Sequence, residues 1–172
     1  GGELEGNQHG LHLMSDSISV EMVDFIDNMN SGLTMEDTDA NSVEDCTFSG
    51  NGVALNIMGE GVTTIENISV SGSSNIGLEI EEMANVSVWD SDFMSNTLDL
   101  ELSGTSIAHL YSTDVDSSLI SIQDTRSEVW VSWEISVWVK DNITGENVSE
   151  ADLIVYTQEG NILGHDMTFL DG

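Results

Sequence analysis

The chain contains no proline and a single cysteine, Cys46, among its 172 residues. Proline removes a backbone donor, so its absence suits a fold whose interior strands use every backbone N–H group. One cysteine excludes an intrachain disulfide framework, and we expect Cys46 to be buried and inert. No apolar run approaches the roughly 20 residues that cross a bilayer, so we expect no membrane span in this segment.

Basic residues are almost as scarce as cysteine. Lys and Arg together number 2 against 32 Asp and Glu, which gives a formal net charge of −30. A surface of this sign repels nucleic acid, anionic membranes and polyanionic substrates, so we expect no nucleic-acid partner. The acidic residues are interspersed with apolar ones instead of forming blocks, which indicates the solvated surface of a folded domain and not a disordered tail.

Two series of apolar residues repeat along the chain. The first series follows turn asparagines at intervals of 20 to 25 residues and comprises Leu11, Leu33, Val53, Leu78, Leu98 and Leu119. The second steps by 22 or 23 residues and comprises Val20, Val43, Ile65, Val88 and Leu110, followed five residues later by Phe25, Phe48, Val70, Phe93 and Val115. A shared period of about 22 residues predicts short strands stacked as the rungs of a solenoid, with each series forming an interior column.

Short polar residues mark the bends between these strands. They recur two places after each member of the second series, with Met22 as the exception, at Asp45, Asn67, Asp90 and Ser112. The stretch CTFSGNGVALNI contains Asn51-Gly52, a pair that alone is typical of hairpins. Within a repeat this pair predicts a positive-φ corner between successive strands instead. The same alternation predicts that Asp99, between Leu98 and Leu100, faces solvent.

The phrases VEDCTFSGNGVALNI and VSVWDSDFMSNTLDLEL resemble the right-handed parallel β-helix repeats of exported proteins. The resemblance covers about residues 10–128. It implies an all-β fold in which residues 1–128 form a right-handed parallel β-helix of about five to six rungs. That family includes polysaccharide lyases and hydrolases, epimerases, adhesins, copper-site maturation proteins and structural stalks, so the resemblance implies the fold and leaves the function open.

The pattern changes after Arg126, where VWVSWEISVWV alternates strictly. This alternation predicts one long half-buried strand with a common face made of Val129, Val131, Trp133, Ile135, Val137 and Val139. The segment that follows resembles the start of a carboxypeptidase regulatory-like or immunoglobulin-like β-sandwich. We therefore expect residues 129–172 to form a truncated, partial β-sandwich. Because the chain opens on Gly1 without a signal peptide, we expect an internal fragment flanked by further rungs and domains of a longer protein.

Two groups of residues are candidates for metal binding. The stretch QHGLHLM supplies His9, His12 and Met14, a set soft enough for copper, and the resemblance to copper-maturation β-helices implies the same metal. The alternative is two exposed histidines and a methionine at the rim of the core.

Pairs of aspartates place two carboxylates on one side of an extended chain, an arrangement that calcium accepts. A first pair is Asp37 and Asp39, and the calcium candidates are Asp90, Asp92, Asp114 and Asp116. We expect Asp92 and Asp114 to share one column. The alternative is an acidic surface that binds no ion, and no other cofactor is expected.

Catalytic residues do not form a recognisable group in this segment. His109 stands alone on its rung, and the two basic residues, Arg126 and Lys140, lie near the junction of the two modules. We therefore assign no catalytic residue, and enzymatic activity stays open because such residues can lie on other rungs. Sequons for N-glycosylation occur at Asn67, Asn85, Asn142 and Asn147, as an exported protein permits.

The sequence as a whole favours a structural or adhesive module of an extracellular or cell-surface protein. The expected partners are cell-surface proteins or polysaccharide. The acidity resembles that of proteins from salt-loving or marine microbes, archaea in particular. The alternative is a fragment of a β-helix polysaccharide lyase or hydrolase, or of a carbohydrate-binding protein, whose catalytic residues lie outside this segment.

Overall fold

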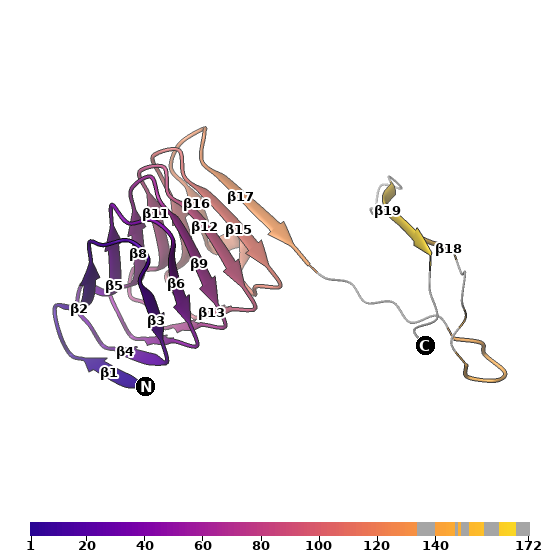
Figure 1. The fold of residues 1–172 in the computed structure, drawn as a ribbon, viewed down its shortest axis with the longest axis horizontal. Helices are drawn as coiled ribbons and strands as arrows, with labels where there is room; N and C mark the ends of the chain where they lie inside the picture. The colour runs from indigo at the N-terminus through magenta and orange to yellow at the C-terminus, as the bar shows by residue number, and fades with distance from the viewer. Residues whose placement is uncertain (134–139, 147, 149–151, 157–161, 168–172) are drawn as a thin grey trace. The chain divides into compact units, whose positions relative to one another are not determined.

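The computed structural model describes residues 1–133, 140–146, 148, 152–156 and 162–167 (Figure 1). The chain divides into two units, Gly1–Glu134 and Ile135–Gly172. The first unit is a parallel β-solenoid of about six turns with about 22 residues per turn. The predicted all-β parallel β-helix is therefore confirmed.

Each of the first five turns of the solenoid contributes one strand to each of three parallel sheets, and the last turn contributes a strand to sheets B and C. Sheet A contains β1 (Gly2–Glu5), β4 (Val23–Ile26), β7 (Thr47–Ser49), β10 (Ser69–Ser71) and β13 (Asp92–Met94). Sheet B contains β2 (His9–Leu13), β5 (Ser31–Glu36), β8 (Val53–Met58), β11 (Ile76–Glu81), β14 (Leu98–Leu102) and β16 (Ile120–Ile122), the last preceded by the 3-10 turn η1 (Ser117–Leu119). Sheet C contains β3 (Ser19–Glu21), β6 (Asn41–Glu44), β9 (Val62–Glu66), β12 (Asn85–Trp89), β15 (Ile107–Tyr111) and β17 (Glu128–Ser132).

The second apolar series forms the interior column that its period predicted. Its five members are register partners in sheet C, from Val20 to Leu110, and all are buried. The residues five places later line up in sheet A, where the rings of Phe25 and Phe48 stack with centroids 4.7 Å apart and planes 3° apart. Constant spacing between the two columns means that the corner joining sheet C to sheet A keeps one length in every turn.

The prediction that the first apolar series forms a single interior column was wrong. Leu33 pairs with Leu55 and not with Val53, and Leu78 pairs with Leu100 and not with Leu98. The corner that joins sheet A to sheet B varies by one residue between turns, so counting from the turn asparagine slips the register. Leu119, the last member, lies in η1, and Ile120 continues the column instead.

Each regular strand of sheet B also contains one inward residue without a register partner. These residues are Gly10, Gly32, Ala54, Gly77 and Asp99. Space is short at this position, because a Cβ on Gly32 would lie 2.8 Å from the carbonyl oxygen of Ala54 and 3.1 Å from the ring of Phe48. The extra residue interrupts the alternation of inward and outward side chains along the strand. The prediction that Asp99 faces solvent was therefore wrong. Asp99 is only 1 % exposed.

The corner at Asn51-Gly52 is a solenoid corner, as predicted, but its positive φ lies one residue earlier. Gly50 has φ +67°, and the equivalent Asp27, Gly72 and Ser95 also have positive φ. Asn51 is buried instead, where its Oδ1 accepts from the backbone N of Asn28 (3.1 Å) and its Nδ2 donates to the carbonyl of Phe25 (2.9 Å). The bend series is confirmed, since Asp45, Asn67, Asp90, Ser112 and the exception Met22 all have positive φ.

The boundary between the two modules lies later than the sequence predicted. Val129 and Val131 pair in parallel with Ala108 and Leu110 of β15, so the segment expected to open a sandwich forms the last rung of sheet C. An alternating strand satisfies a solenoid column and a sandwich face equally well, which is why the pattern misled. Residues 134–139, which include Ile135, Val137 and Val139, lie outside the described residues.

The second unit contains two described strands, β18 (Asp152–Tyr156) and β19 (Ile162–Met167). They pair antiparallel, with Asp152 opposite Met167. The predicted immunoglobulin-like or carboxypeptidase regulatory-like sandwich stays a prediction.

A first prediction concerns the aromatic column. Phe93→Ala should lower the free energy of unfolding by about 3–5 kcal/mol, because it leaves a cavity beside Val70 in a filled column. Met94→Ala, one residue on, should change it by less than about 0.5 kcal/mol, since Met94 points outward and is exposed. Urea unfolding of both variants measures the difference, and equal losses would contradict the assignment of inner and outer faces.

A second prediction concerns the buried carboxylate. Asp99 accepts hydrogen bonds from Asn96 Nδ2 (2.9 Å) and from the backbone N of Asp116 (2.9 Å). Asp99→Ala leaves both donors without this acceptor, so it should cost about 2 kcal/mol of stability. Asp24→Ala removes the same charge from an exposed position in β4 and serves as the control. Matching urea midpoints for the two variants would refute the role of Asp99.

Candidate functional site

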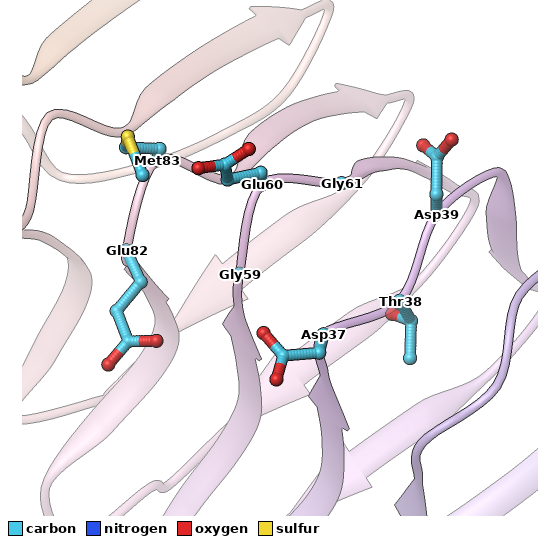
Figure 2. Close-up of a pocket in the computed structure, with 8 residues that line it drawn as sticks. All are labelled: Asp37, Thr38, Asp39, Gly59, Glu60, Gly61, Glu82 and Met83. Atoms are coloured by element: carbon cyan, nitrogen blue, oxygen red, sulfur yellow. The ribbon is translucent and has the colours of Figure 1, made fainter.

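An acidic hollow lies at the corners between sheets B and C (Figure 2). Its volume is about 480 Å³, and three successive turns of the solenoid line it. The lining residues are Asp37, Thr38 and Asp39 after β5, Gly59, Glu60 and Gly61 after β8, and Glu82 and Met83 after β11. Four of these eight residues are acidic and none is basic.

Two glycines of the wall pack closely on the preceding turn, where a side chain would not fit. A Cβ on Gly61 would clash with the carbonyl oxygen of Thr38, and a Cβ on Gly59 would lie 2.9 Å from Asp37 Oδ1. Thr38 itself is only 3 % exposed, and its hydroxyl oxygen has no hydrogen-bond partner. Asp39, in contrast to Thr38, has a hydrogen-bond partner, since its Oδ1 accepts from the backbone N of Val62 at 2.9 Å. In Figure 2 the Asp39 carboxylate is directed away from those of Asp37 and Glu60.

A second surface lies on the outward face of sheet C at its C-terminal end. Alternate residues of β12, β15 and β17 form it, and we call this three-by-three array the aromatic platform: Asn85, Ser87, Trp89, Ile107, His109, Tyr111, Glu128, Trp130 and Ser132. With strands about 4.8 Å apart and alternate residues about 6.7 Å apart, the array measures roughly 10 by 13 Å. This array was missed in the sequence, because Trp89 and Tyr111 occupy equivalent positions of successive turns but Trp130 is the register partner of His109.

The rings of the platform are ordered by contacts with one another and with a carboxylate. Trp89 and Tyr111 stack with centroids 3.9 Å apart and planes 13° apart, and the His109 ring lies 6.2 Å from that of Tyr111. Trp130 is 56 % exposed, and its Nε1 donates to Glu128 Oε2 at 3.0 Å. Large exposed aromatic side chains beside hydroxyl, imidazole and carboxylate groups are typical of binding surfaces.

Sheet B carries a titratable carboxyl on its outward face. Burial, followed by repulsion from Glu81 and Glu101, raises the pKa of Glu79 to about 6. Asn56 Nδ2 donates to Glu79 Oε2 at 2.9 Å, and Glu101 is the register partner of Glu79 on the next turn. The Glu79 carboxyl group is therefore expected to change its protonation state near pH 6, closer to neutrality than an ordinary glutamate.

The copper candidates lie on or just after β2. His12 is exposed, as its place between two leucines predicted, and its Nε2 lies 2.9 Å from Glu36 Oε2. His9 Nδ1 lies 2.8 Å from Ser31 Oγ, and His9 Nε2 lies 3.1 Å from Asn30 Nδ2. Met14 is exposed beyond the end of the strand. Three of the four imidazole nitrogens thus have side-chain partners on neighbouring turns.

The calcium candidates lie on and after β13. Asp92 and Asp114 are joined by an isolated parallel bridge, so the prediction that they share a column is confirmed. Asp116 accepts from the hydroxyl and the backbone N of Ser118, which lowers the pKa of its carboxyl. Asp90 occupies a positive-φ bend. In the described part of the chain, no three His, Cys, Asp or Glu side chains form a group that fits a metal ion.

The remaining candidates are placed as follows. Cys46 is buried, and burial raises the pKa of its thiol, so the expectation of an inert cysteine agrees with the structure. Of the sequon asparagines, Asn67 and Asn142 are exposed, Asn85 belongs to the aromatic platform, and Asn147 lies outside the described residues.

Comparison with known protein families finds a match to one family. A family model described as NosD, a periplasmic copper-binding protein, matches residues 1–126. The chain belongs to the NosD family. No curated protein and no solved structure gives a significant match.

The family agrees with the fold and with the predicted location. The match ends at residue 126, two residues before β17, and so covers the solenoid except for that last strand. The family's description as periplasmic agrees with a location outside the cytoplasm. Among the described residues, no helix has the length and apolar character needed to cross a membrane.

The copper named by the family does not fit the side chains as they lie. The imidazoles of His9 and His12 are hydrogen-bonded to Ser31, Asn30 and Glu36, and the described residues contain no metal-binding group of three. Copper binding at His9, His12 and Met14 therefore stays a prediction from the sequence.

A third prediction follows from the raised pKa of Glu79. The folded state holds this proton more tightly than the unfolded chain does, so the contribution to stability is complete below about pH 4.5 and is lost as the pH rises through about 6. Glu79→Gln should therefore stabilise the protein above pH 6, by up to about 1 kcal/mol once solvent screening is allowed for, and change little near pH 4. Urea unfolding across this pH range measures the effect. Glu3→Gln, at an exposed site of β1, is the control, and a pH-independent effect of Glu79→Gln would contradict the assignment.

Proposed function

We propose that this chain is a structural and adhesive module of an extracellular or cell-surface protein, and that its aromatic platform contacts a neutral polysaccharide. The observation that carries the proposal is the exposed Trp130, opposite His109, on the same outward face as the stacked rings of Trp89 and Tyr111. The C–H faces of sugar rings are apolar and pack on aromatic side chains. Sugar hydroxyls can exchange hydrogen bonds with Ser87, His109 and other polar groups of the array.

Rigidity supports the adhesive role. The platform stands on consecutive strands of one parallel sheet, and on β12 and β15 the residues between its outward members, Val86, Val88, Ala108 and Leu110, are buried in the solenoid core. A site on strands with buried neighbours keeps its geometry without an ordering cost on binding. A regular row of side chains at a fixed strand spacing suits an extended polymer better than a small ligand.

The charge of the chain selects the kind of polymer. A formal net charge of −30 repels polyanionic chains, so a neutral polysaccharide is the better partner. The same charge favours an origin in a salt-loving or marine microbe, because an acidic surface is stabilised when salt screens its self-repulsion.

A second candidate function is that of a fragment of a polysaccharide hydrolase or lyase. It is favoured by one observation, the raised pKa of Glu79 beside its register partner Glu101, because glycoside hydrolysis uses two carboxyl groups, one of them a general acid with a raised pKa. The remaining groups needed for catalysis would lie on rungs beyond this segment.

A fourth prediction tests the platform. In native affinity electrophoresis, the full chain should be retarded by at least one of a soluble β-glucan, a mannan and an arabinoxylan, but not by anionic alginate. Trp130→Ala should abolish the retardation, because it removes the most exposed aromatic of the array. Trp133→Ala, which removes an equally exposed indole outside the array, should leave it unchanged. Absence of retardation by all three neutral polymers, or equal losses in the two variants, would refute the proposal.

A further inference from the structure

We propose that the acidic hollow between sheets B and C binds a hard divalent cation of the calcium class. The hollow is separate from the aromatic platform, because it lies at the corners that follow β5, β8 and β11, whereas the platform lies on the outward faces of later strands. The proposed site is also different from the aspartates that the sequence singled out on and after β13.

The first argument is uncompensated charge. Asp37, Asp39, Glu60 and Glu82 come from three successive turns and line one hollow. The whole chain has only two basic residues, Arg126 and Lys140. Within the described residues the only ion pair joins His12 and Glu36, so these four carboxylates have no cationic partner there. Repulsion among them is relieved most effectively by an ion that several of them share.

The second argument is independent of charge and rests on Thr38. This residue is 97 % buried, since its exposed fraction is 3 %, and its hydroxyl oxygen has no hydrogen-bond partner. Buried hydroxyl groups almost always have a partner, so an unpaired one in the wall of a hollow calls for an explanation. In Figure 2 this oxygen lies on the side of Thr38 that faces Asp37. It can serve as a neutral oxygen ligand next to a carboxylate.

The chemistry of the ligands selects the ion. Except for the thioether of Met83, the side-chain donors of the hollow are carboxylate and hydroxyl oxygens. Calcium accepts 6–8 oxygen ligands at about 2.3–2.6 Å in irregular geometry, whereas magnesium demands a near-ideal octahedron. Copper and zinc prefer nitrogen and sulfur ligands, which are scarce here.

The structure also limits the affinity. No three acidic side chains of the described residues already converge at metal-binding distances, and Asp39 is held by Val62. An ion must therefore draw the carboxylates of Asp37, Glu60 and Glu82 inward, into the open volume of the hollow. A site that has to be assembled in this way should have a dissociation constant in the range of extracellular calcium modules, about 10⁻⁴–10⁻³ M.

The experiment is calorimetric titration of the full chain with calcium chloride in a background of about 0.15 M sodium chloride, together with thermal unfolding. We expect saturable binding, and a rise in melting temperature that saturates with it and exceeds that from an ionic-strength-matched dose of sodium chloride. Magnesium should bind more weakly. A response that sodium chloride reproduces, or one that does not saturate, would overturn the proposal.

Three variants locate the site. The double variant Asp37→Asn with Glu60→Gln should weaken calcium binding at least tenfold. The matched control, Asp92→Asn with Asp114→Asn, removes the same charge from the pair on and after β13 and should leave binding unchanged. Thr38→Val, which changes no charge, should weaken binding several-fold without lowering the melting temperature in the absence of calcium. Loss of binding in the control, or full binding in both Thr38→Val and the double variant, would place the ion elsewhere and refute the proposal.

Discussion

Stacking of equivalent side chains between parallel strands is the constraint on which the rest of this structure depends. Neighbouring turns lie about 4.8 Å apart, so every inward residue contacts its counterparts above and below, as Phe25 does with Phe48. A charge repeated in such a column would be costly, which confines the many acidic residues to outward faces and corners. Asp99 is the one buried acidic residue among those whose exposure is described, and it is tolerated because Asn96 and the backbone of Asp116 both donate to it.

The sequence revealed those parts of the fold in which spacing is constant. Val43 and Phe48 stand five residues apart, as do their counterparts in the other turns, so the sheet C column, the sheet A column and the bend between them were all predicted correctly. The sheet B column was not, because the preceding corner changes length by one residue and because an extra inward residue interrupts the alternation. Glycine or alanine fills that extra position in most turns, but Asp99 gives no such signal.

The candidate sites differ in how far a sequence can reveal them. The aromatic platform is periodic only in part, since Trp89 and Tyr111 are register partners, whereas Trp130 lies opposite His109 on the next strand. The acidic hollow is not periodic, because corner residues such as Thr38 and Glu60 have no fixed place in the repeat. Its decisive features are the packing of Gly61 on the Thr38 carbonyl and the unpaired Thr38 hydroxyl, both of which require the folded chain.

The division between columns, faces and corners also determines what each surface can bind. Outward faces of parallel sheets are regular and nearly flat, so they present repeating rows of side chains to an extended polymer. Corners are irregular and concave, and their backbone bends leave room for an ion beside clustered carboxylates. With two basic residues in 172, the chain cannot neutralise those carboxylates itself, so their counterions must come from the surrounding solution. The stability of the solenoid and the occupancy of its acidic corners are therefore coupled to the ionic composition outside the protein.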